Sequence, residues 1–466
     1  MTHIHLVGIG GSGLSAIARI LLERGEVVSG SDLEYSSFAR EIEELGAKVI
    51  IGHRADNILG ADLIIRSSAI PDTNAEILAA LESGIPIYKR ADFLGELMVG
   101  KKAIAIAGTH GKTTTTAMIS WILTTLGQDP SYIIGGVSKN LRQNAHSGEG
   151  ELFVIEADEY DYMFLGLQPQ IAIVTNIEHD HPDVYPTEEV FFQAFIDFAN
   201  RINDGGVLIA CQDDFGAAKL VDMTADYGFS RYIYGLGSTS ASETLDYSVQ
   251  NLTLTGDSLF IFDATFRGER LAEVSISLPG EHNVLNALAA LAVAHQLDLP
   301  VVDAAQALAE YRGTERRFEV RGEFSGIEVI DDYAHHPTEI KATLAAARSR
   351  FPGRRLWAVW QPHTYSRTSA LFDEFLTSFE DADHVLITEI FASRETPSQN
   401  ESSLQLVQAM NHPDVHYLAS NGQVVDYLVS NLKHGDVLMV LSAGDAIQIS
   451  EEVIRRLSMN GHGKIS

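Results

Sequence analysis

The sequence predicts an α/β protein built from three domains. Its 466 residues are too many for one hydrophobic core and correspond to about three domains of ordinary size. Short apolar segments with the composition of strands alternate with helical patterns, which is typical of parallel sheets. Apolar residues make up 45% of the chain and charged residues 21%, as in globular domains that fold in water. We expect the units 1–98, 99–312 and 313–466.

The first unit opens with a strand, a glycine-rich turn, a helix and a second strand. Gly8, Gly10 and Gly13 fit the pattern G-x-G-x-x-G, and Asp32 follows about 20 residues later at the end of the second strand. This fingerprint is typical of a dinucleotide-binding turn, so an NAD-dependent oxidoreductase is one interpretation of this Rossmann-like unit. The remaining elements are three strands and one helix, expected at 48–51, 62–65, 85–88 and 74–82.

The second unit begins with an apolar strand that ends in a loop bounded by Gly108 and Gly111. Lys112 and Thr113 then open a helix. Backbone N–H groups of such a loop hold phosphate oxygens, the lysine adds positive charge, and the threonine hydroxyl suits Mg²⁺. The standard P-loop pattern would need a glycine at position 106, which is Ile106. We therefore predict a nucleotide-phosphate site in a loop related to the P-loop, with an ordinary tight turn as the alternative.

The rest of the second unit continues the alternation and then departs from it. Between about residues 230 and 278, apolar residues alternate with period two, which predicts a β meander. The central domain is therefore expected to be P-loop ATPase-like with an added meander. Its strands are expected at 103–107, 132–134, 152–155, 171–175 and 207–211, and its helices after Lys112, Thr187 and Glu281.

Carboxylates and histidines follow two of these strands. Glu156 comes directly after an apolar strand, where a Mg²⁺ ion bound to nucleotide phosphates needs a carboxylate ligand. The segment 175–183 holds two histidines and two aspartates, and we favour His181 as a ligand at a magnesium–nucleotide centre. Its spacing matches no closed zinc pattern. The alternatives are a solvated acidic loop for Glu156 and a structural turn for His179.

The third unit is expected to be a second Rossmann-like α/β sheet. Ligands of open sheets collect at the carboxyl ends of strands, where this unit carries cationic and aromatic residues. In a chain of net charge −30, arginines at strand ends favour anion binding, with salt bridges to carboxylates as the alternative. The strands are expected at 327–330, 355–360, 384–388 and 437–441, and the residues concerned are Arg316, Arg317, Tyr333, His335, His336, His363 and Arg367.

The net charge of −30 argues against nucleic acid or an anionic membrane as a general partner, because both repel an acidic surface. No apolar stretch reaches the roughly 18 residues needed to span a bilayer, and no basic signal-peptide region opens the chain, so we expect a cytoplasmic protein. The single cysteine, Cys211, is expected in a buried strand, without a disulfide or a catalytic role.

Together these motifs resemble the Mur ligases, the ATP-dependent amide-bond-forming enzymes of peptidoglycan precursor assembly. The resemblance covers the whole chain. It is closest to the branch that joins L-alanine to UDP-N-acetylmuramate. It rests on the ordered segments 8–13, 108–114, 156–159, 175–181, 280–287, 316–318, 331–340 and 361–368.

This resemblance implies UDP-N-acetylmuramate and L-alanine as substrates, ATP and Mg²⁺ as cofactors, and an acyl-phosphate intermediate. We expect a monomer or a weak homodimer. Lys112, Glu156 and His181 would be catalytic, and Thr113, Glu156 and His181 would hold the metal. The implied ATP-binding residues are Gly108, Thr109, His110, Gly111, Lys112, Thr113, Thr114, His282, Asn283, Arg316, Arg317 and Asp332. The first glycine loop would bind the UDP-sugar in place of NAD, through Gly10, Gly11, Ser12, Gly13, Asp32, Ser67 and Ser68. The amino acid would meet Tyr333, His335, His363 and Arg367.

The sequence departs from the family pattern in two places. Relatives that act later in the pathway carry a carbamylated lysine after the Asp-His motif, and the predicted helix 190–202 contains no lysine. This absence favours the alanine-adding branch and leaves the ligands of a second metal open. Position 364 is Thr364 where arginine is common, so we expect Arg367 to take more of the substrate carboxylate. The alternatives are a recycling ligase that attaches a whole peptide to the same sugar nucleotide, and a non-catalytic, ATP-gated binding protein.

Overall fold

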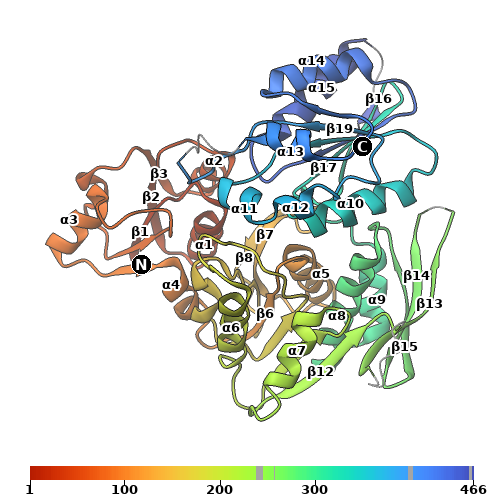
Figure 1. The fold of residues 1–466 in the computed structure, drawn as a ribbon. Coiled ribbons are helices and arrows are strands. Elements are labelled where there is room, and N and C mark those ends of the chain that lie inside the picture. Colours follow the sequence, from red (N-terminus) through yellow and green to blue (C-terminus); the bar gives the residue numbers. More distant parts are fainter. Residues whose placement is uncertain (238–244, 257, 397–401, 461–463, 466) are drawn as a thin grey trace.

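The computed structural model describes residues 1–237, 245–256, 258–396, 402–460 and 464–465. Three open sheets with flanking helices follow one another along the chain. Figure 1 shows the first sheet in a lobe at the left, the second at the base, and the third above the second. The α/β class and the three-sheet layout predicted from the sequence are confirmed.

The first sheet is entirely parallel, with strand order β3-β2-β1-β4-β5. β1 lies at the centre, and its carboxyl end runs into the glycine turn that precedes α1. Short polar side chains begin the helices, as where Ser36 accepts a hydrogen bond from Ala39 N and Asn74 one from Glu76 N. The elements are β1 (His3–Val7), α1 (Ser12–Glu23), β2 (Val27–Asp32), α2 (Ser37–Glu44), β3 (Lys48–Ile51), η1 (Ala55–Ile58), β4 (Leu63–Arg66), α3 (Ala75–Ser83), β5 (Ile87–Lys89) and α4 (Arg90–Leu97).

The second sheet has ten strands in the order β15-β14-β13-β12-β11-β10-β6-β9-β7-β8. Its central strands are continuous apolar runs because helices cover both faces of a parallel sheet. The strands are β6 (Lys102–Ala107), β7 (Ser131–Ser138), β8 (Gln143–His146), β9 (Leu152–Glu156), β10 (Ile171–Val174), β11 (Val207–Cys211), β12 (Ser230–Gly235), β13 (Tyr247–Leu254), β14 (Phe260–Phe266) and β15 (Glu269–Ile276). The helices are α5 (Lys112–Thr125), η2 (Tyr160–Gly166), α6 (Glu188–Ala199), α7 (Phe215–Met223), α8 (Glu281–Gln296) and α9 (Val301–Ala309).

The predicted meander is shorter than the pattern suggested. β13, β14 and β15 are antiparallel neighbours, as expected. β12 was wrongly included, because it pairs in parallel with β11 and with β13. It belongs to the parallel core, and antiparallel pairing begins between β13 and β14. Residues 238–244, between β12 and β13, lie outside the described residues. Cys211 ends β11 as a buried free thiol, as predicted.

The third sheet has the order β20-β19-β18-β21-β17-β16-β22, with β16 antiparallel to both of its neighbours. In Figure 1, α10, α11 and α12 lie on the side of this sheet that faces the central unit. The strands are β16 (Glu319–Phe324), β17 (Ile327–Asp332), β18 (Leu356–Trp360), β19 (His384–Ile387), β20 (Val415–Tyr417), β21 (Val437–Leu441) and β22 (Lys464–Ile465). The helices are α10 (Pro337–Arg350), α11 (Tyr365–Ala370), α12 (Phe372–Phe375), α13 (Ser403–Ala409), α14 (Asn421–Asn431) and α15 (Ile447–Asn460).

The connection between the second and third sheets is hydrogen-bonded to strand β7. Thr314 forms an isolated antiparallel bridge with Ser138. Lys139 N donates to Gly313 O at 3.0 Å, and Glu315 N donates to Val137 O at 2.9 Å. The chain therefore enters its third unit as a short extra strand beside the central sheet.

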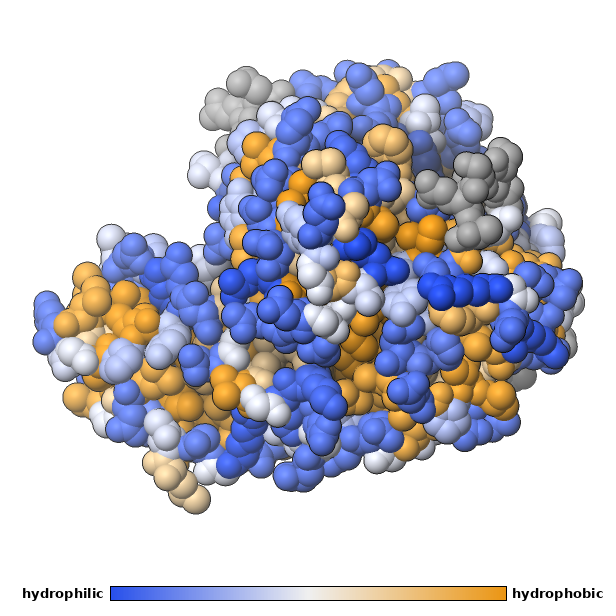
Figure 2. Space-filling view, turned by 90° about the horizontal axis from the view of Figure 1, so that it is seen from below, coloured by the Kyte–Doolittle hydropathy of each residue, from blue (hydrophilic) through white to orange (hydrophobic). Residues whose placement is uncertain are grey.

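Figure 2 shows hydrophilic residues over all parts of the face seen from below, with hydrophobic residues between them. Within the described ranges, none of the helices combines the length and the apolar character that crossing a membrane requires.

Candidate active site

The loop between β6 and α5 has a backbone that requires glycine at both ends. Gly108 has φ +133°, and a Cβ there would lie 2.1 Å from Thr175 Oγ1; Gly111 has φ +82°. The loop is fixed by the segment after β10. Thr175 Oγ1 donates to His110 O at 2.6 Å, and His110 N donates to Asn176 Oδ1 at 2.7 Å. α5 begins at Lys112, as predicted, so its free N–H groups face the loop.

Lys112 is held inside this loop by a buried ion pair. Its Nζ lies 2.8 Å from Glu159 Oε2 and donates to Gly108 O at 2.5 Å and Thr109 O at 3.1 Å. Burial by itself lowers the pKa of Lys112, but nearby carboxylates, Glu159 foremost, outweigh burial and raise it. Burial alone would raise the pKa of Glu159, and the lysine charge lowers it. Both side chains are therefore ionised.

Oxygen ligands suited to Mg²⁺ lie beside the lysine. Thr113 Oγ1 donates to Glu156 Oε1 at 3.1 Å, and Gly135 N donates to Glu156 Oε2 at 2.7 Å. Burial raises the pKa of Glu156, so the carboxylate lacks a full counter-charge at this position. His181 Nε2 lies 3.4 Å from Glu159 Oε1. A hydroxyl and a half-buried carboxylate in contact are the donor set that a hard divalent cation takes in a phosphate site, so these residues fit Mg²⁺.

A cavity of about 190 Å³ opens beside the loop, between the second and third units. Cys211 and Tyr234 also line it, at the ends of two central strands. Eight predicted ATP-binding residues line it: His110, Gly111, Thr113, Thr114, His282, Asn283, Arg317 and Asp332. Four others, Gly108, Thr109, Lys112 and Arg316, are not part of its lining.

Arg316 and Asp332, two predicted ATP-binding residues of the third unit, already form hydrogen bonds within the protein. Arg316 Nη2 donates to Ser442 O at 2.7 Å, away from the cavity. Asp332 accepts from Phe318 N at 2.6 Å and from Ala334 N at 2.7 Å. Burial raises the pKa of Asp332 to about 6. Asp332 therefore fixes the entry of its own segment into the site.

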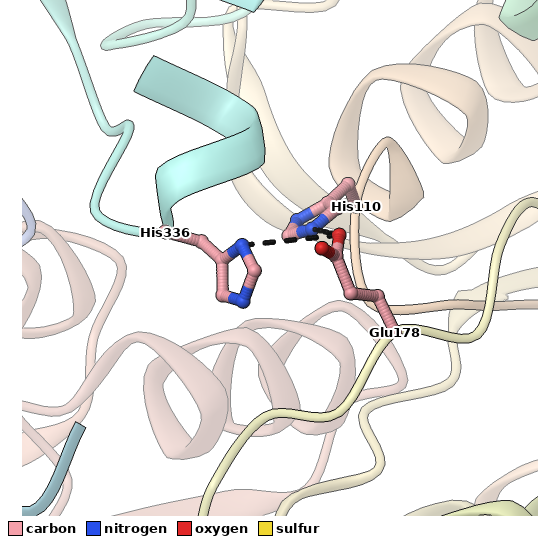
Figure 3. A group of neighbouring side chains, drawn as sticks. All are labelled: His110, Glu178 and His336. Atoms are coloured by element: carbon pink, nitrogen blue, oxygen red, sulfur yellow. Dashed lines mark hydrogen bonds and ion pairs between the residues drawn. The ribbon is translucent and has the colours of Figure 1, made fainter. Parts of the chain in front are cut away.

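The phosphate loop also touches the third unit through the group in Figure 3. His110 Nε2 lies 2.9 Å from Glu178 Oε2, and His336 Nδ1 lies 3.8 Å from the same oxygen. Thr338 Oγ1, from the start of α10, donates to Glu178 Oε1 at 2.6 Å. Burial lowers the pKa of His110, but Glu178 and Glu339 outweigh it and raise the value to about 9. The ligand atoms of the three drawn residues lie within 4.8 Å of one another, as in a metal site. The direct hydrogen bond and the protonated His110 favour an ion pair between His110 and Glu178 over a metal site.

The predicted amino-acid residues lie together at the carboxyl ends of β17 and β18. The rings of His335 and His363 are 5.8 Å apart, and Tyr333 lies 5.4 Å from His335. Burial lowers the pKa of His335 to about 4 and that of His363 to about 2, so both are neutral at pH 7.

The hydrogen bonds fix the tautomers of the two rings. His335 Nδ1 faces Tyr333 O at 2.9 Å and must donate, which leaves a lone pair on Nε2. His363 Nδ1 faces Arg367 Nη1 at 3.1 Å and must accept, which places its proton on Nε2. The Nε2 atom of His335 is therefore a hydrogen-bond acceptor and that of His363 a hydrogen-bond donor.

Arg367 is paired with a carboxylate of the central unit. Its Nε lies 2.8 Å from Asp180 Oδ1, and its Nη2 lies 3.2 Å from Oδ2. Both side chains are about 95% buried, at 4% and 5% exposure. Arg367 and His181, next to Asp180, hold the pKa of that carboxyl well below its usual range despite burial. The guanidinium predicted to bind substrate therefore already carries an internal counter-ion.

A second cavity, of about 350 Å³, lies where the first unit meets the second. Of the residues predicted for the UDP-sugar, Ser68 lines it, together with the basic residues Arg66, Lys89 and Arg90. Gly10 to Gly13, Asp32 and Ser67 do not line it. Of these residues, Gly13 lies against a lining residue of the cavity, because a Cβ at Gly13 would lie 1.9 Å from Arg90 Nη1.

The first glycine turn uses its acidic residue internally. Gly10 N donates to Asp32 Oδ2 at 2.8 Å, and a Cβ at Gly10 would lie 2.9 Å from the same oxygen. Asp32 therefore braces the turn, and the positive charge beside the turn comes from Arg90.

Comparison with known proteins agrees with this architecture. The first unit matches the model of the Mur ligase family, catalytic domain (residues 3–102). The second matches the Mur ligase middle domain (106–294), and the third the Mur ligase, glutamate ligase domain (316–444). The fold and the phosphate loop thus define an ATP-dependent ligase of three units, and the chain belongs to the Mur ligase family.

Individual relatives show which Mur ligases the chain resembles in sequence and structure. The chain is 42% identical over 459 residues to the UDP-N-acetylmuramate–L-alanine ligase of Trichlorobacter lovleyi, covering 97% of this chain and 98% of that one. It is 44% identical over 452 residues to the ligase of the same name from Syntrophotalea carbinolica, covering 96% of each. The crystal structure of UDP-N-acetylmuramate-alanine ligase MurC from Thermotoga maritima superposes with a TM-score of 0.83 at 27% identity, covering 99% and 100% of the chains. A murein peptide ligase from Psychrobacter arcticus gives 0.72 at 27% identity, covering 98% and 99%.

Several residues at the site were missed by sequence reasoning. Glu159, Glu178 and Asp180 stand inside motifs that were recognised, but a strand-end carboxylate carries no sign of which cation it will meet. Arg90 begins α4 outside any motif, and only its contact with Gly13 reveals it.

Proposed function

We propose that this protein uses ATP to join L-alanine to the lactyl carboxylate of UDP-N-acetylmuramate, releasing ADP and phosphate. Membership of the family supports ATP-dependent ligation, and the relatives with 42–44% identity carry the name of this activity. The proposal includes Mg²⁺ as cofactor, the cytoplasm as location, and a monomer or weak homodimer as the working form.

One observation carries the proposal, namely that Asp180 and His181 connect two chemically different halves of a cleft. Asp180 holds Arg367, beside the two histidines of the third unit. His181 contacts Glu159, which holds Lys112 in the phosphate loop. The half of the cleft that would activate the carboxylate and the half that would receive the amine are therefore attached to neighbouring residues, His181 and Asp180. A ligase that orients two substrates needs such a fixed arrangement.

In the proposed reaction, an oxygen of the lactyl carboxylate forms a bond to the γ-phosphorus of ATP while the bond to the β,γ-bridging oxygen breaks. ADP leaves and an acyl phosphate remains. The nitrogen of alanine then attacks the acyl carbon, and the tetrahedral intermediate expels phosphate to give the amide. Lys112 stabilises negative charge that develops on the transferring group.

Other side chains would hold the metal ion and contact the amine of alanine. Thr113, Glu156 and His181 would hold Mg²⁺, which supplies charge neutralisation at the phosphate oxygens when bound. Alanine arrives as an ammonium ion and must lose a proton before it attacks. His335 Nε2 carries a lone pair on a neutral imidazole in the amine-receiving half, so it accepts a hydrogen bond from the amine and orients it. With a pKa lowered to about 4, His335 is too weakly basic to hold the ammonium proton.

The UDP-sugar is proposed to occupy the second cavity, between the first and second units. Arg66, Lys89 and Arg90 line it, and a diphosphate needs such local positive charge in an acidic protein. The glycine turn 8–13 braces Arg90 from one side, which fits its proposed role in UDP binding.

The direct test is phosphate release by the purified chain with MgATP and UDP-N-acetylmuramate. It is run with L-alanine, with the tripeptide L-Ala-γ-D-Glu-diaminopimelate, and with neither, and the product is weighed by mass spectrometry. Alanine-dependent release with a product heavier by one alanyl residue supports the proposal. Release only with the tripeptide assigns the recycling reaction, and no release with either contradicts both.

Lys112→Ala separates the two ends of the site. We expect turnover to be abolished while UDP-N-acetylmuramate binding, measured calorimetrically, stays unchanged, because Lys112 is outside the second cavity. Lys102→Ala, at an exposed ion pair, is the matched control and should leave both unchanged. Loss of sugar-nucleotide binding in Lys112→Ala would contradict the proposed division of the sites.

A further inference from the structure

The amino-acid half of the cleft lacks a free cation on the segment that was expected to supply one. Arg367 donates to Asp180 through Nε and Nη2, and to His363 through Nη1. Thr364 is buried, and its Oγ1 accepts a hydrogen bond from Arg367 N as the cap of α11. An amino acid with a carboxylate entering here must find its positive partner elsewhere.

Arg394 supplies an uncommitted guanidinium at this place. It lies in the loop after β19, and its Cζ is 3.8 Å from the centroid of the Tyr160 ring. The same ring lies 5.1 Å from that of His181, edge to face. None of the ion pairs found among the described residues includes Arg394, and its side chain is exposed. A stacked but unpaired guanidinium keeps its N–H groups available to a ligand.

The loop that carries Arg394 is fastened to the amino-acid segment. His363 forms an isolated parallel bridge with Phe391, and their rings stack at 5.8 Å. Thr364 N donates to Phe391 O at 2.9 Å, and Phe391 N donates to Pro362 O at 2.8 Å. Glu395 Oε2, next to Arg394, accepts from Tyr365 N at 2.5 Å. Arg394 is therefore positioned by the segment 362–365. This segment carries Thr364 at the position where arginine is common in the family.

The charge of Arg394 also lowers the pKa of the His363 imidazole. After burial, three positive or potentially positive neighbours lower the pKa of His363, namely His335, Arg367 and Arg394, against the opposing effect of Asp180. This places the Arg394 charge within range of the His363 ring, whose Nε2 carries a proton to donate.

We propose that Arg394, with the N–H of His363 Nε2, receives the α-carboxylate of the incoming amino acid, and that Arg367 is a positioning residue neutralised by Asp180. The assignment rests on the proposed function and names a specificity residue for it. A carboxylate between a guanidinium and an imidazole N–H satisfies two charge-assisted hydrogen bonds. The ammonium end then lies toward the lone pair of His335 Nε2.

The test compares Arg394→Ala with the unaltered enzyme, using L-alanine and L-alaninamide, which lacks the carboxylate. We expect the KM for L-alanine to rise by about tenfold or more, with the KM values for ATP and UDP-N-acetylmuramate within about twofold. The preference for L-alanine over L-alaninamide should fall by about the same factor, because that preference measures recognition of the carboxylate. Arg394→Lys should recover part of it.

Arg267→Ala is the matched control. It removes another exposed arginine stacked on a ring, 5.0 Å from Phe266 in the β14–β15 hairpin, and should change none of these values. An unchanged preference in Arg394→Ala overturns the assignment, as does a rise confined to the KM for ATP. Failure of the proposed function is distinct, because the unaltered enzyme would then show no alanine-dependent turnover.

Discussion

Lys112 and Glu159 form an ion pair across the phosphate loop, with 2.8 Å between Nζ and Oε2 and exposures of 12% and 1%. A nucleotide phosphate that approaches Lys112 therefore meets a lysine already neutralised by a carboxylate. Binding exchanges one counter-ion for another, so the lysine is ordered before the nucleotide arrives.

Glu159→Gln leaves Lys112 without this partner. We expect the midpoint of thermal unfolding to fall, since removing one member of a buried pair costs about 3–5 kcal/mol. Saturating MgATP should narrow the gap to the unaltered protein, because phosphate oxygens replace the lost charge. Glu151→Gln, at the exposed pair with Lys102, should stay close to the unaltered protein in both conditions. An equal gap with and without nucleotide would contradict this account of Lys112.

The His110–Glu178 pair gives a pH dependence with a definite sign. The pKa of His110 is raised from 6.5 to about 9, so its stabilisation is complete below pH 6.5 and is lost as pH rises through 9. The pKa of Glu178 is lowered from 4.5 to about 2, chiefly by His110 against the effect of burial, so its contribution is lost as pH falls through 2.

A double-mutant cycle of His110→Gln and Glu178→Gln measures this coupling by denaturant unfolding. We expect a coupling energy of about 0.5–3 kcal/mol at pH 6 that declines toward zero above pH 9. The cycle cancels the titration of other groups. A coupling that stays the same from pH 6 to above pH 9 would show that His110 is neutral in the folded protein.

Asp180→Asn leaves the buried guanidinium of Arg367 without a counter-ion. The expected loss of stability is about 3–5 kcal/mol, because an uncompensated buried charge remains. The double variant Asp180→Asn with Arg367→Met should recover much of this loss, which calorimetry can measure. Asp263→Asn, at the pair with the half-exposed Arg270, is the surface control with a loss below about 1 kcal/mol. If the double variant were less stable than Asp180→Asn, the pair would not be a simple charge balance.

Glu156→Gln tests the proposed magnesium ligand. Gln keeps the hydrogen bond from Thr113 Oγ1 but loses the negative charge, so the Mg²⁺ concentration for half-maximal turnover should rise by about tenfold or more. Glu151→Gln, at the exposed ion pair with Lys102, is the control and should leave the Mg²⁺ requirement unchanged. An unchanged Mg²⁺ requirement in Glu156→Gln would exclude it as a ligand.

Much of the fold was predictable because buried parallel strands are short apolar runs with glycine or polar residues after them. The segments before Gly8, Gly108 and Glu156 all show this pattern. Several elements were missed because they lack it. β8, β16, β20 and β22 are short and partly polar, and α7 and α9 had no motif beside them. β12 was misassigned because its sequence resembles that of the following strands and does not reveal that its neighbours are parallel.

The site was predictable only to the level of residue type and strand end. Which charged side chains pair depends on how the three units pack against one another, and the local sequence does not reveal that packing. Arg367 was expected to face the substrate, yet Asp180, 187 residues away, holds it. The glycine turn was correctly located, but its positive charge comes from Arg90, which no motif contains.

The bridge between Thr314 and Ser138 determines how any rotation of the third unit would be distributed. It fixes the pivot on β7, three residues beyond Gly135, whose N–H holds Glu156. Displacement in a rotation grows with distance from the axis, so groups beside the pivot would move least. A rotation about this bridge would therefore leave Thr113, Gly135 and Glu156 in register with one another.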